Sequence, residues 1–167
     1  MNIFYLDEDP VLAAQYQCNK HVCKMIIETA QMLSTAHRML DGIDYADEQK
    51  LYRCTHVNHP STVWVRDSKA NYQWTYDHLI ALLNEYTHRY GKVHATDRLV
   101  NALAKIPTNI NKKKAFTDPP LCMDDKFKQR DHIEAYRDFY FGAKHGFAKW
   151  TKRDCPEWFY QRVFTVT

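Results

Sequence analysis

Glycine and proline are scarce in this chain, with 4 and 6 among 167 residues. So few chain-breaking residues exclude a collagen-like or low-complexity chain and are typical of a helix-rich protein. Hydrophobic residues make up 45% of the sequence, which is enough to build a packed core. No internal repeat or linker-like segment interrupts the chain. We therefore predict a single domain over residues 1–167.

Long hydrophobic runs are also missing. No run approaches the roughly 20 apolar residues that cross a bilayer, so we predict no membrane partner. Residues 1–6 are apolar but too short for a signal peptide, and no basic residue precedes them. The five cysteines are odd in number and irregularly spaced, unlike a secreted disulfide framework. A reducing cytoplasm is the expected location.

Several motifs of metal and cofactor chemistry are absent. The sequence contains no Cys-x-x-Cys, no His-Glu-x-x-His and no glycine-rich phosphate loop. His56 and His59 have a spacing at which two imidazoles can share an ion, but the other histidines are scattered. We predict no cofactor and no metal; if an ion does bind, His21, Glu28 and His59 are the expected cluster.

The charge balance is only mildly basic. A net charge of +3 is low for a dedicated nucleic-acid-binding domain. Lysines nevertheless concentrate locally, at residues 112–114 and 144–152. Aromatic residues reach 14%, and such rings either fill cores or stack on bases. Composition therefore leaves both an ordinary core and a local nucleic-acid surface open.

The apolar periodicity predicts an all-α fold, a single compact helical bundle built on two long helices with a short N-terminal arm. The first helix is expected to start at Pro10, capped by Asp7 or Asp9, and to stop at Gly42. Its length predicts a break near residues 18–19. The other expected segments are a helix over 60–90 with Ser61 or Ser68 as an alternative cap, a helix over 97–105, a surface loop over 107–128 and a helix over 130–149.

A polar stripe runs along the first long helix. His21, Lys24 and Glu28 recur at intervals of 3 and 4 and share one face, opposite an apolar face. The stripe combines an imidazole, a cation and a carboxylate, the mixture that acid–base chemistry needs. We interpret Glu28 as the candidate catalytic residue, with His21 and Lys24 tuning or orienting it. The alternative is an amphipathic helix that carries an ordinary Lys–Glu pair.

Two further segments combine cations with aromatic or amide side chains. A helix beginning at Pro60 can attract phosphate at its N-terminus, and a later helix interleaves basic and aromatic residues. The alternative is that the polar residues cap helices and the rings fill the core. The candidate nucleic-acid- or phosphate-binding residues are His59, Arg66, Lys69, Asn71 and Trp74 in the first segment, and Tyr136, Arg137 and Lys144 in the second.

The order of three features is familiar: the arm followed by His21-x6-Glu28, the helix end Glu85-Tyr86-Thr87-His88-Arg89-Tyr90-Gly91, and the aromatic segment Trp158-Phe159-Tyr160. This order resembles the phage-type pyrimidine-dimer DNA glycosylases, an all-α family of glycosylase/AP-lyases, over roughly residues 1–92. In that family a glutamate on the first long helix assists cleavage at a sugar C1′, and a histidine lies seven residues before it. The resemblance implies this role for Glu28, with DNA as the partner.

Two features depart from the family pattern. The family's nucleophile is the α-amine of a small residue exposed by loss of the initiator Met, whereas Asn2 is bulky, so Met1 is expected to be retained. Ile27 and Gln31 stand where the family has arginines. A hydrolytic N-glycosidase, with Glu28 activating water, is compatible with both departures. We therefore expect an enzyme that cleaves a base–sugar bond in nucleic acid or a nucleotide; the alternatives are a non-catalytic module that binds nucleic acid or a nucleotide, and a protein inhibitor.

Overall fold

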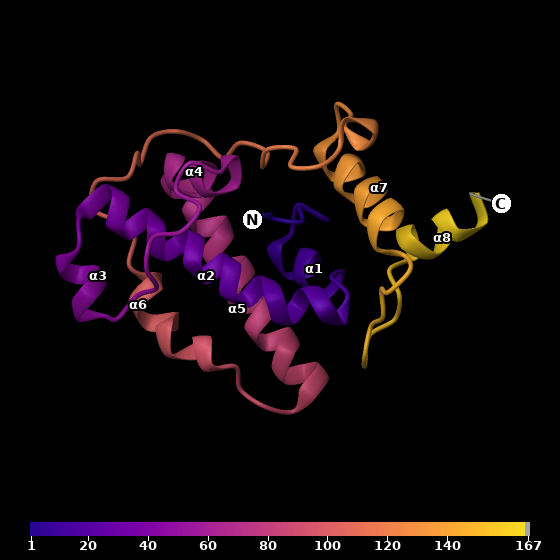
Figure 1. Cartoon of the computed structure of the whole chain (residues 1–167), viewed down its shortest axis with the longest axis horizontal. Helices are drawn as coiled ribbons and strands as arrows, with labels where there is room; N and C mark the ends of the chain where they lie inside the picture. The colour runs from indigo at the N-terminus through magenta and orange to yellow at the C-terminus, as the bar shows by residue number, and fades with distance from the viewer. Residues whose placement is uncertain (166–167) are drawn as a thin grey trace.

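The computed structural model describes residues 1–165, and all the regular secondary structure within them is helical (Figure 1). The predicted all-α fold class is confirmed. In chain order the elements are α1 (Pro10–Gln15), α2 (Asn19–Asp41), α3 (Asp44–Glu48), α4 (Pro60–Asp67), α5 (Lys69–Tyr90), the 3₁₀ helix η1 (Ala95–Leu99), α6 (Val100–Ala104), the 3₁₀ helix η2 (Asp125–Phe127), α7 (His132–Lys144) and α8 (Glu157–Thr165).

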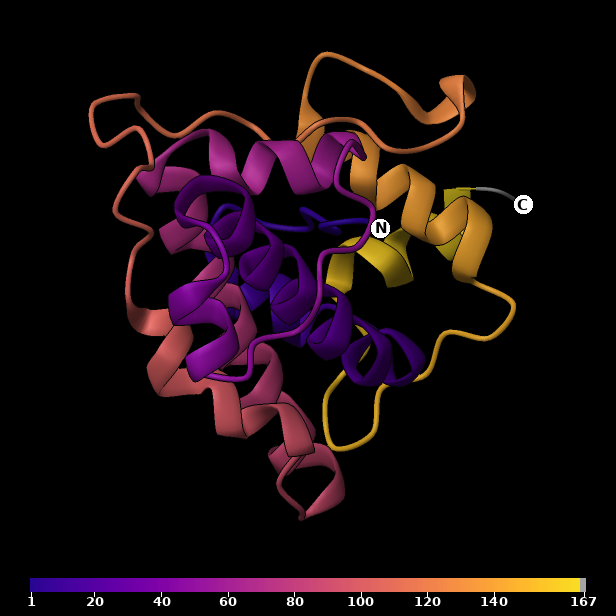
Figure 2. The ribbon, with the colours of Figure 1, turned by 60° about the vertical axis from the view of Figure 1, so that its left-hand side comes forward.

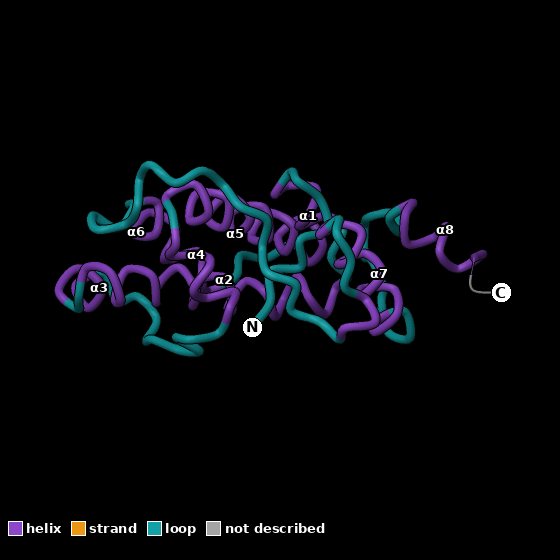
Figure 3. Tube along the Cα trace, turned by 90° about the horizontal axis from the view of Figure 1, so that it is seen from above, coloured by secondary structure: helices purple, strands orange, loops and turns teal. Residues whose placement is uncertain are grey.

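Two long helices, α2 and α5, pack against each other at the centre of the molecule. The short helix α1 lies on α5, and α4 packs on both long helices (Figure 2). The helices α3 and α8 lie at opposite ends of the molecule, as two perpendicular views show (Figure 1, Figure 3). A single hydrophobic core runs from the N-terminal arm to the C-terminal helices and includes Leu6, Ile26, Leu33, Leu82, Leu103, Tyr140 and Phe159.

Short-range signals explain where several helices begin and end. The Asp9 side chain accepts a hydrogen bond from the Val11 N–H and so caps α1. The His59 ring caps α4 in the same way, because its Nδ1 accepts from the Ser61 N–H. Gly91 ends α5 with φ of +68°, a left-handed conformation that glycine adopts without strain.

Several helices differ from those expected. The helix expected over 60–90 is two helices, because Ser68 has an extended backbone and its Oγ caps α5 by accepting from the Asn71 N–H. The first long helix is interrupted between α1 and α2, beside the expected break. The helix expected over 130–149 is shorter: α7 ends at Lys144, where the Phe147 and Ala148 N–H groups turn back onto the Lys144 carbonyl. The helix expected over 97–105 divides into η1 and α6.

The N-terminal arm is buried against the body of the protein rather than paired as a strand. Residues 3–6 are at most 5% exposed. Phe4 has φ of +52°, a strained value for a non-glycine residue, and Asn2 Oδ1 braces it by accepting the Phe4 N–H. Arg137 on α7 donates to the Leu6 carbonyl at 2.9 Å. The arm therefore connects the first helices to the C-terminal part of the chain.

The expected surface loop forms over residues 105–131 and contains only the short η2. It is attached to the body at defined points: the Asn111 carbonyl accepts from the Lys69 N–H, and Thr117 bonds to Asn71. Of the helices in residues 1–165, none has the combination of length and hydrophobicity that a bilayer span requires.

Candidate active site

Glu28 lies in the middle of α2 with a cation one turn before it. Its carboxylate is 4.0 Å from the Lys24 ammonium, and the Glu28 side chain is 20% exposed. Glu28 can therefore meet a substrate from solvent, with a positive charge beside it.

His59, from the start of α4, faces the same region. Its Nδ1 is engaged in capping α4, which leaves Nε2 as the ring atom open to a ligand. Burial lowers the pKa of His59; the Met1 amine and His56 lower the pKa further, whereas Glu28 raises it. Since electrostatic effects of this kind act over short distances, the amine, both imidazoles and the carboxylate share one neighbourhood.

His21 lies two turns before Glu28 and is buried. Its ring stacks on Phe4 with 4.5 Å between centroids, and its Nδ1 is 2.8 Å from the Tyr140 hydroxyl. That hydroxyl oxygen also accepts from the Cys18 N–H, so its own proton is the one available to His21 Nδ1. The His21 ring proton is thereby placed on Nε2. His21 is a positioned, neutral ring rather than a base.

A group of lysines surrounds His21. Burial lowers its pKa to about 3, and Lys144, Lys24 and Lys20 lower it further in that order. Lys144 comes from α7, more than a hundred residues along the chain from α2. Five of the residues singled out from the sequence are thus linked in pairs: Lys24 with Glu28, Glu28 with His59, and both Lys24 and Lys144 with His21.

Three other candidate residues lie in the interior. Asn71, Trp74 and Tyr136 are at most 9% exposed, and each donates a hydrogen bond to a backbone carbonyl of a neighbouring segment. Their polar groups are thus used to hold the loop and the arm in place. Sequence spacing alone could not separate this use from base stacking, because buried and base-contacting rings have the same chemistry.

The remaining candidate cations differ in accessibility. Arg137 is paired with Asp7 at 3.2 Å and lies over the Trp158 ring, so it is engaged within the protein. Arg66 has one guanidinium nitrogen buried without a hydrogen-bond partner among residues 1–165. Lys69 is exposed at the start of α5. Of the three, only Lys69 presents a freely accessible charge.

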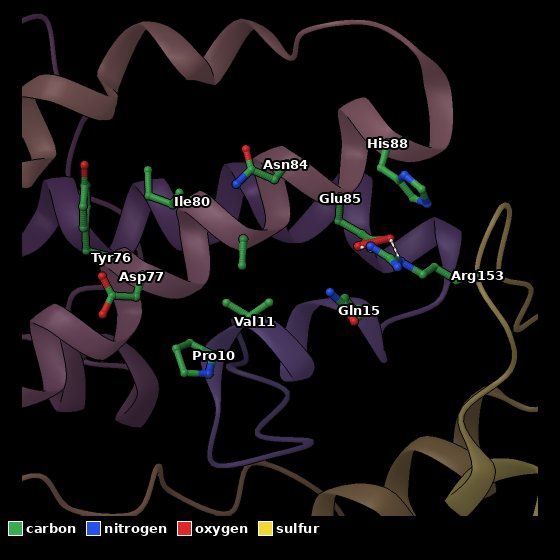
Figure 4. Close-up of a pocket in the computed structure, with 11 residues that line it drawn as sticks. Pro10, Val11, Gln15, Tyr76, Asp77, Ile80, Asn84, Glu85, His88 and Arg153 are labelled. Atoms are coloured by element: carbon green, nitrogen blue, oxygen red, sulfur yellow. Dashed lines mark hydrogen bonds and ion pairs between the residues drawn. The ribbon is translucent and has the colours of Figure 1, made fainter.

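A cavity of about 750 Å³ opens between α1 and α5, and none of the candidate residues lines it. At one end Glu85 accepts from Arg153 at 2.8 Å, as the dashed lines in Figure 4 mark. Glu85 also accepts from Arg89 at 3.0 Å. Burial by itself raises the Glu85 pKa, but the two arginines outweigh it and hold that pKa below its ordinary value. Glu85 and Arg89 therefore serve here as an internal ion cluster. The partner Arg153 was not foreseen from the sequence.

Comparison with known families decides the relationship. The sequence profile of the family described as pyrimidine dimer DNA glycosylase matches residues 1–99, more than half of the chain. The chain belongs to this family. Its glycosylase-like function in general and a DNA substrate follow from that membership. No curated protein and no solved structure matches the chain significantly.

The family match covers the arm, α1 to α5 and η1, and ends at the last residue of η1. It therefore includes Glu28, Lys24, His21 and His59, whereas Lys144 lies beyond it. No set of three or more His, Cys, Asp or Glu side chains in residues 1–165 is arranged to hold a metal ion. Two residues near the site were missed from the sequence, Lys20 and Phe147; only their basic and aromatic character could have signalled them.

Proposed function

We propose that the protein excises damaged pyrimidines from DNA by cleaving the base–sugar bond, with Glu28 as the essential carboxylate. Membership of the pyrimidine dimer DNA glycosylase family supports the reaction class. The observation that carries the assignment of Glu28 is its position: it is a partly exposed carboxylate beside the Lys24 ammonium, and it acts on the pKa of His59.

Cleavage of this bond builds positive charge on the sugar. As the bond between C1′ and the base nitrogen breaks, the base leaves with the electron pair, and the carboxylate of Glu28 stabilises the cationic sugar. Water then adds to C1′ and gives its proton to Glu28. The Lys24 ammonium lies beside the Glu28 carboxylate, and His59, whose pKa burial lowers, supplies a neutral ring near the reacting group.

The surrounding cations hold the DNA backbone in this proposal. Lys24 lies one turn before Glu28, Lys144 lies near His21, and Lys69 is exposed at the start of α5. Ammonium groups of this kind bind phosphate without reading sequence. The damaged nucleotide must leave the base stack to reach Glu28, and unstacking costs least where damage has already weakened the duplex.

The first experiment replaces Glu28 with Gln. Cleavage of the base–sugar bond in an oligonucleotide duplex carrying one cyclobutane thymine dimer, measured as alkali-labile strand breaks at the abasic sugar, is expected to fall by about 100- to 10,000-fold. The thermal midpoint and DNA affinity are expected to stay close to wild type. Glu48→Gln is the matched control, since Glu48 is an exposed carboxylate on α3. Turnover by Glu28→Gln at the wild-type rate would remove Glu28 from the mechanism. DNA binding by the wild type without product would favour a non-catalytic module.

A second candidate chemistry uses the Met1 amine, which acts on the pKa of His59 and so lies near Glu28. In a lyase reaction the amine attacks C1′ and displaces the base, leaving a Schiff base that borohydride reduces to a stable adduct. Hydrolysis predicts base release without such an adduct. Adding a short peptide ahead of Met1 is expected to leave hydrolysis intact. A borohydride adduct that disappears in the extended protein would establish the lyase instead.

A further inference from the structure

One aromatic ring near the candidate site is exposed and surrounded by positive charge. Phe147, in the turn after α7, is 39% exposed. The Lys20 ammonium lies 4.8 Å from its ring centroid and the Lys144 ammonium 6.0 Å. We name these three residues the Lys–Phe cluster. Its Phe147 and Lys144 belong to the part of the chain beyond the family match.

The cluster is held in place by the backbone rather than by burial. The Phe147 N–H donates to the Lys144 carbonyl at 3.1 Å, and the Ala148 N–H donates to the same oxygen at 3.0 Å. The His21 ring on α2 meets the Phe147 ring in a T-shaped contact, with 6.0 Å between centroids. The ring is 39% exposed, so part of it is available to a planar ligand, which can stack on a ring already held in place at small entropic cost.

The two lysines of the cluster have no acidic partner. Neither Lys20 nor Lys144 forms an ion pair with any residue in the described part of the chain. Two uncompensated ammonium groups beside an exposed ring match a nucleotide, whose planar base lies between negatively charged phosphates. An apolar protein partner would leave these two ammonium groups without a negatively charged partner.

The cluster also lies at a useful distance from Glu28. Lys20 precedes Glu28 by eight residues on α2, which corresponds to about 12 Å along the helix. Successive bases of a strand are about 3.4 Å apart when stacked. A base on Phe147 would therefore lie a few nucleotides from a sugar at Glu28, on the same stretch of DNA.

We propose that Phe147 stacks on an unpaired DNA base next to the damaged site, while Lys20 and Lys144 contact the flanking phosphates. This inference rests on the proposed glycosylase function and names how damaged DNA is told apart from intact DNA. In an intact duplex each base is already stacked between its neighbours, so the Phe147 ring has no partner. Where damage or base extrusion leaves a base unstacked, the ring replaces a lost neighbour.

The binding test uses a duplex containing one tetrahydrofuran abasic analogue, which cannot release a base. Phe147→Leu is expected to weaken binding of this duplex by about 5- to 100-fold, with little change for intact duplex. Phe147→Tyr keeps a stacking ring and is expected to bind like wild type. Because the side chain is exposed, both variants are expected to unfold at the wild-type temperature. Equal affinity of all three proteins for the abasic duplex would overturn the proposal.

A photochemical test asks whether the ring touches a base. 5-Iodouracil placed at successive positions beside the abasic analogue is expected to cross-link to Phe147 at one or two positions, identified by mass spectrometry of the peptide. The Leu variant is expected to lose the cross-link. A cross-link to other residues only would place the strand elsewhere.

The role of the lysines is tested by salt dependence. Lys144→Met is expected to reduce the slope of log affinity against log salt by about 1, as loss of one phosphate contact does. Lys50→Met is the control, because Lys50 is an exposed lysine after α3, at the opposite end of the molecule (Figure 1). Equal slopes for both variants would remove Lys144 from the interface.

The inference and the proposed function fail in different ways. Glu28-dependent base release combined with wild-type behaviour of Phe147→Leu overturns the stacking site and keeps the glycosylase. Phe147-dependent binding of the abasic duplex, with no base released from any DNA, overturns the glycosylase and keeps the stacking site. Absence of DNA binding by the wild type overturns both.

Discussion

At the scale of single residues, His78 shows how the interior fixes one protonation state. Its Nδ1 donates to the Pro10 carbonyl at 3.0 Å, and its Nε2 accepts from the Gln17 amide at 3.0 Å. The ring also stacks on Trp74 with 5.0 Å between centroids. Burial lowers the His78 pKa to about 4, even though the bond to Pro10 raises it. A second ring proton would lie on Nε2 and point at the Gln17 amide N–H, so this hydrogen bond would be lost.

The first prediction concerns acid stability. Between about pH 6.5 and pH 4 the unfolded chain binds a proton at His78 and the folded chain does not, so the free energy of unfolding falls as pH falls through this window. The full effect is about 3 kcal/mol. His78→Asn keeps a donor for Pro10 without the titration. Urea unfolding across this pH range is expected to show a shallower decline for the variant. Parallel curves for the two proteins would contradict this account.

Neutral histidine also bears on the pH dependence of catalysis. Because the His21 pKa is lowered to about 3 by burial and three lysines, His21 does not change charge near neutral pH. We therefore expect no ionisation of His21 in the pH profile of kcat/KM between about pH 5 and pH 8. Comparing that profile for wild type and His21→Asn checks this. A limb of the profile that vanishes in the variant would make His21 a titrating participant.

At the scale of elements, the junction of α4 and α5 depends on one serine. Ser68 is fully buried, and its Oγ satisfies the Asn71 N–H at 3.1 Å. Ser68→Ala is expected to lower the free energy of unfolding by about 1–2 kcal/mol, the upper part of the range for a lost cap, since the freed N–H has no access to water. Chemical denaturation measures it. Asp131→Ala removes the exposed cap of α7 and is expected to cost less. A larger loss at Asp131 would contradict the burial argument.

The same junction shows what the sequence could predict. Pro10, Pro60 and Gly91 act on their own backbone, so the helix ends beside them follow from the residues alone. The division at Ser68 is weaker as a signal, because serine also occurs inside helices. Likewise α7 ends at Lys144 through a chain reversal that no proline announces. Apolar periodicity therefore predicted which segments are helical better than it predicted where each helix begins and ends.

The sequence likewise predicted one part of the candidate site and not the other. His21, Lys24 and Glu28 lie on one face of one helix, so spacing alone placed them together. Lys144 and Phe147 join them only through the packing of α7, a contact between segments over a hundred residues apart. Burial of Trp74 was equally out of reach, since it depends on the arm supplying a carbonyl to its indole N–H.

At the scale of the whole molecule, the family-matched stretch shares its core with the remainder of the chain. Leu103, Tyr136, Tyr140 and Phe159 are buried in the same cluster as residues of α2 and α5. A fragment of residues 1–99 would expose the surfaces that these side chains cover. We expect it to unfold without a cooperative transition and to lose near-ultraviolet circular dichroism. A sharp transition in the fragment would contradict the single-domain prediction.

Two groups on α5 that respond differently to acid hold the two ends of α1: His78 at the start and the Glu85–Arg89 pair at the end. Near the start of α1, the Pro10 carbonyl accepts a hydrogen bond from His78. The contribution of neutral His78 to the free energy of unfolding decreases as pH falls from about 6.5 toward 4. Near its end, the Gln15 carbonyl is held by Arg89, which Glu85 anchors. The Glu85 pKa lies below its ordinary 4.5, so this anchor is intact above about pH 4.5. Between about pH 6.5 and pH 4.5, acidification therefore weakens the hold of His78 on Pro10 while the hold of Arg89 on Gln15 remains, and we expect α1 to loosen first at its Pro10 end.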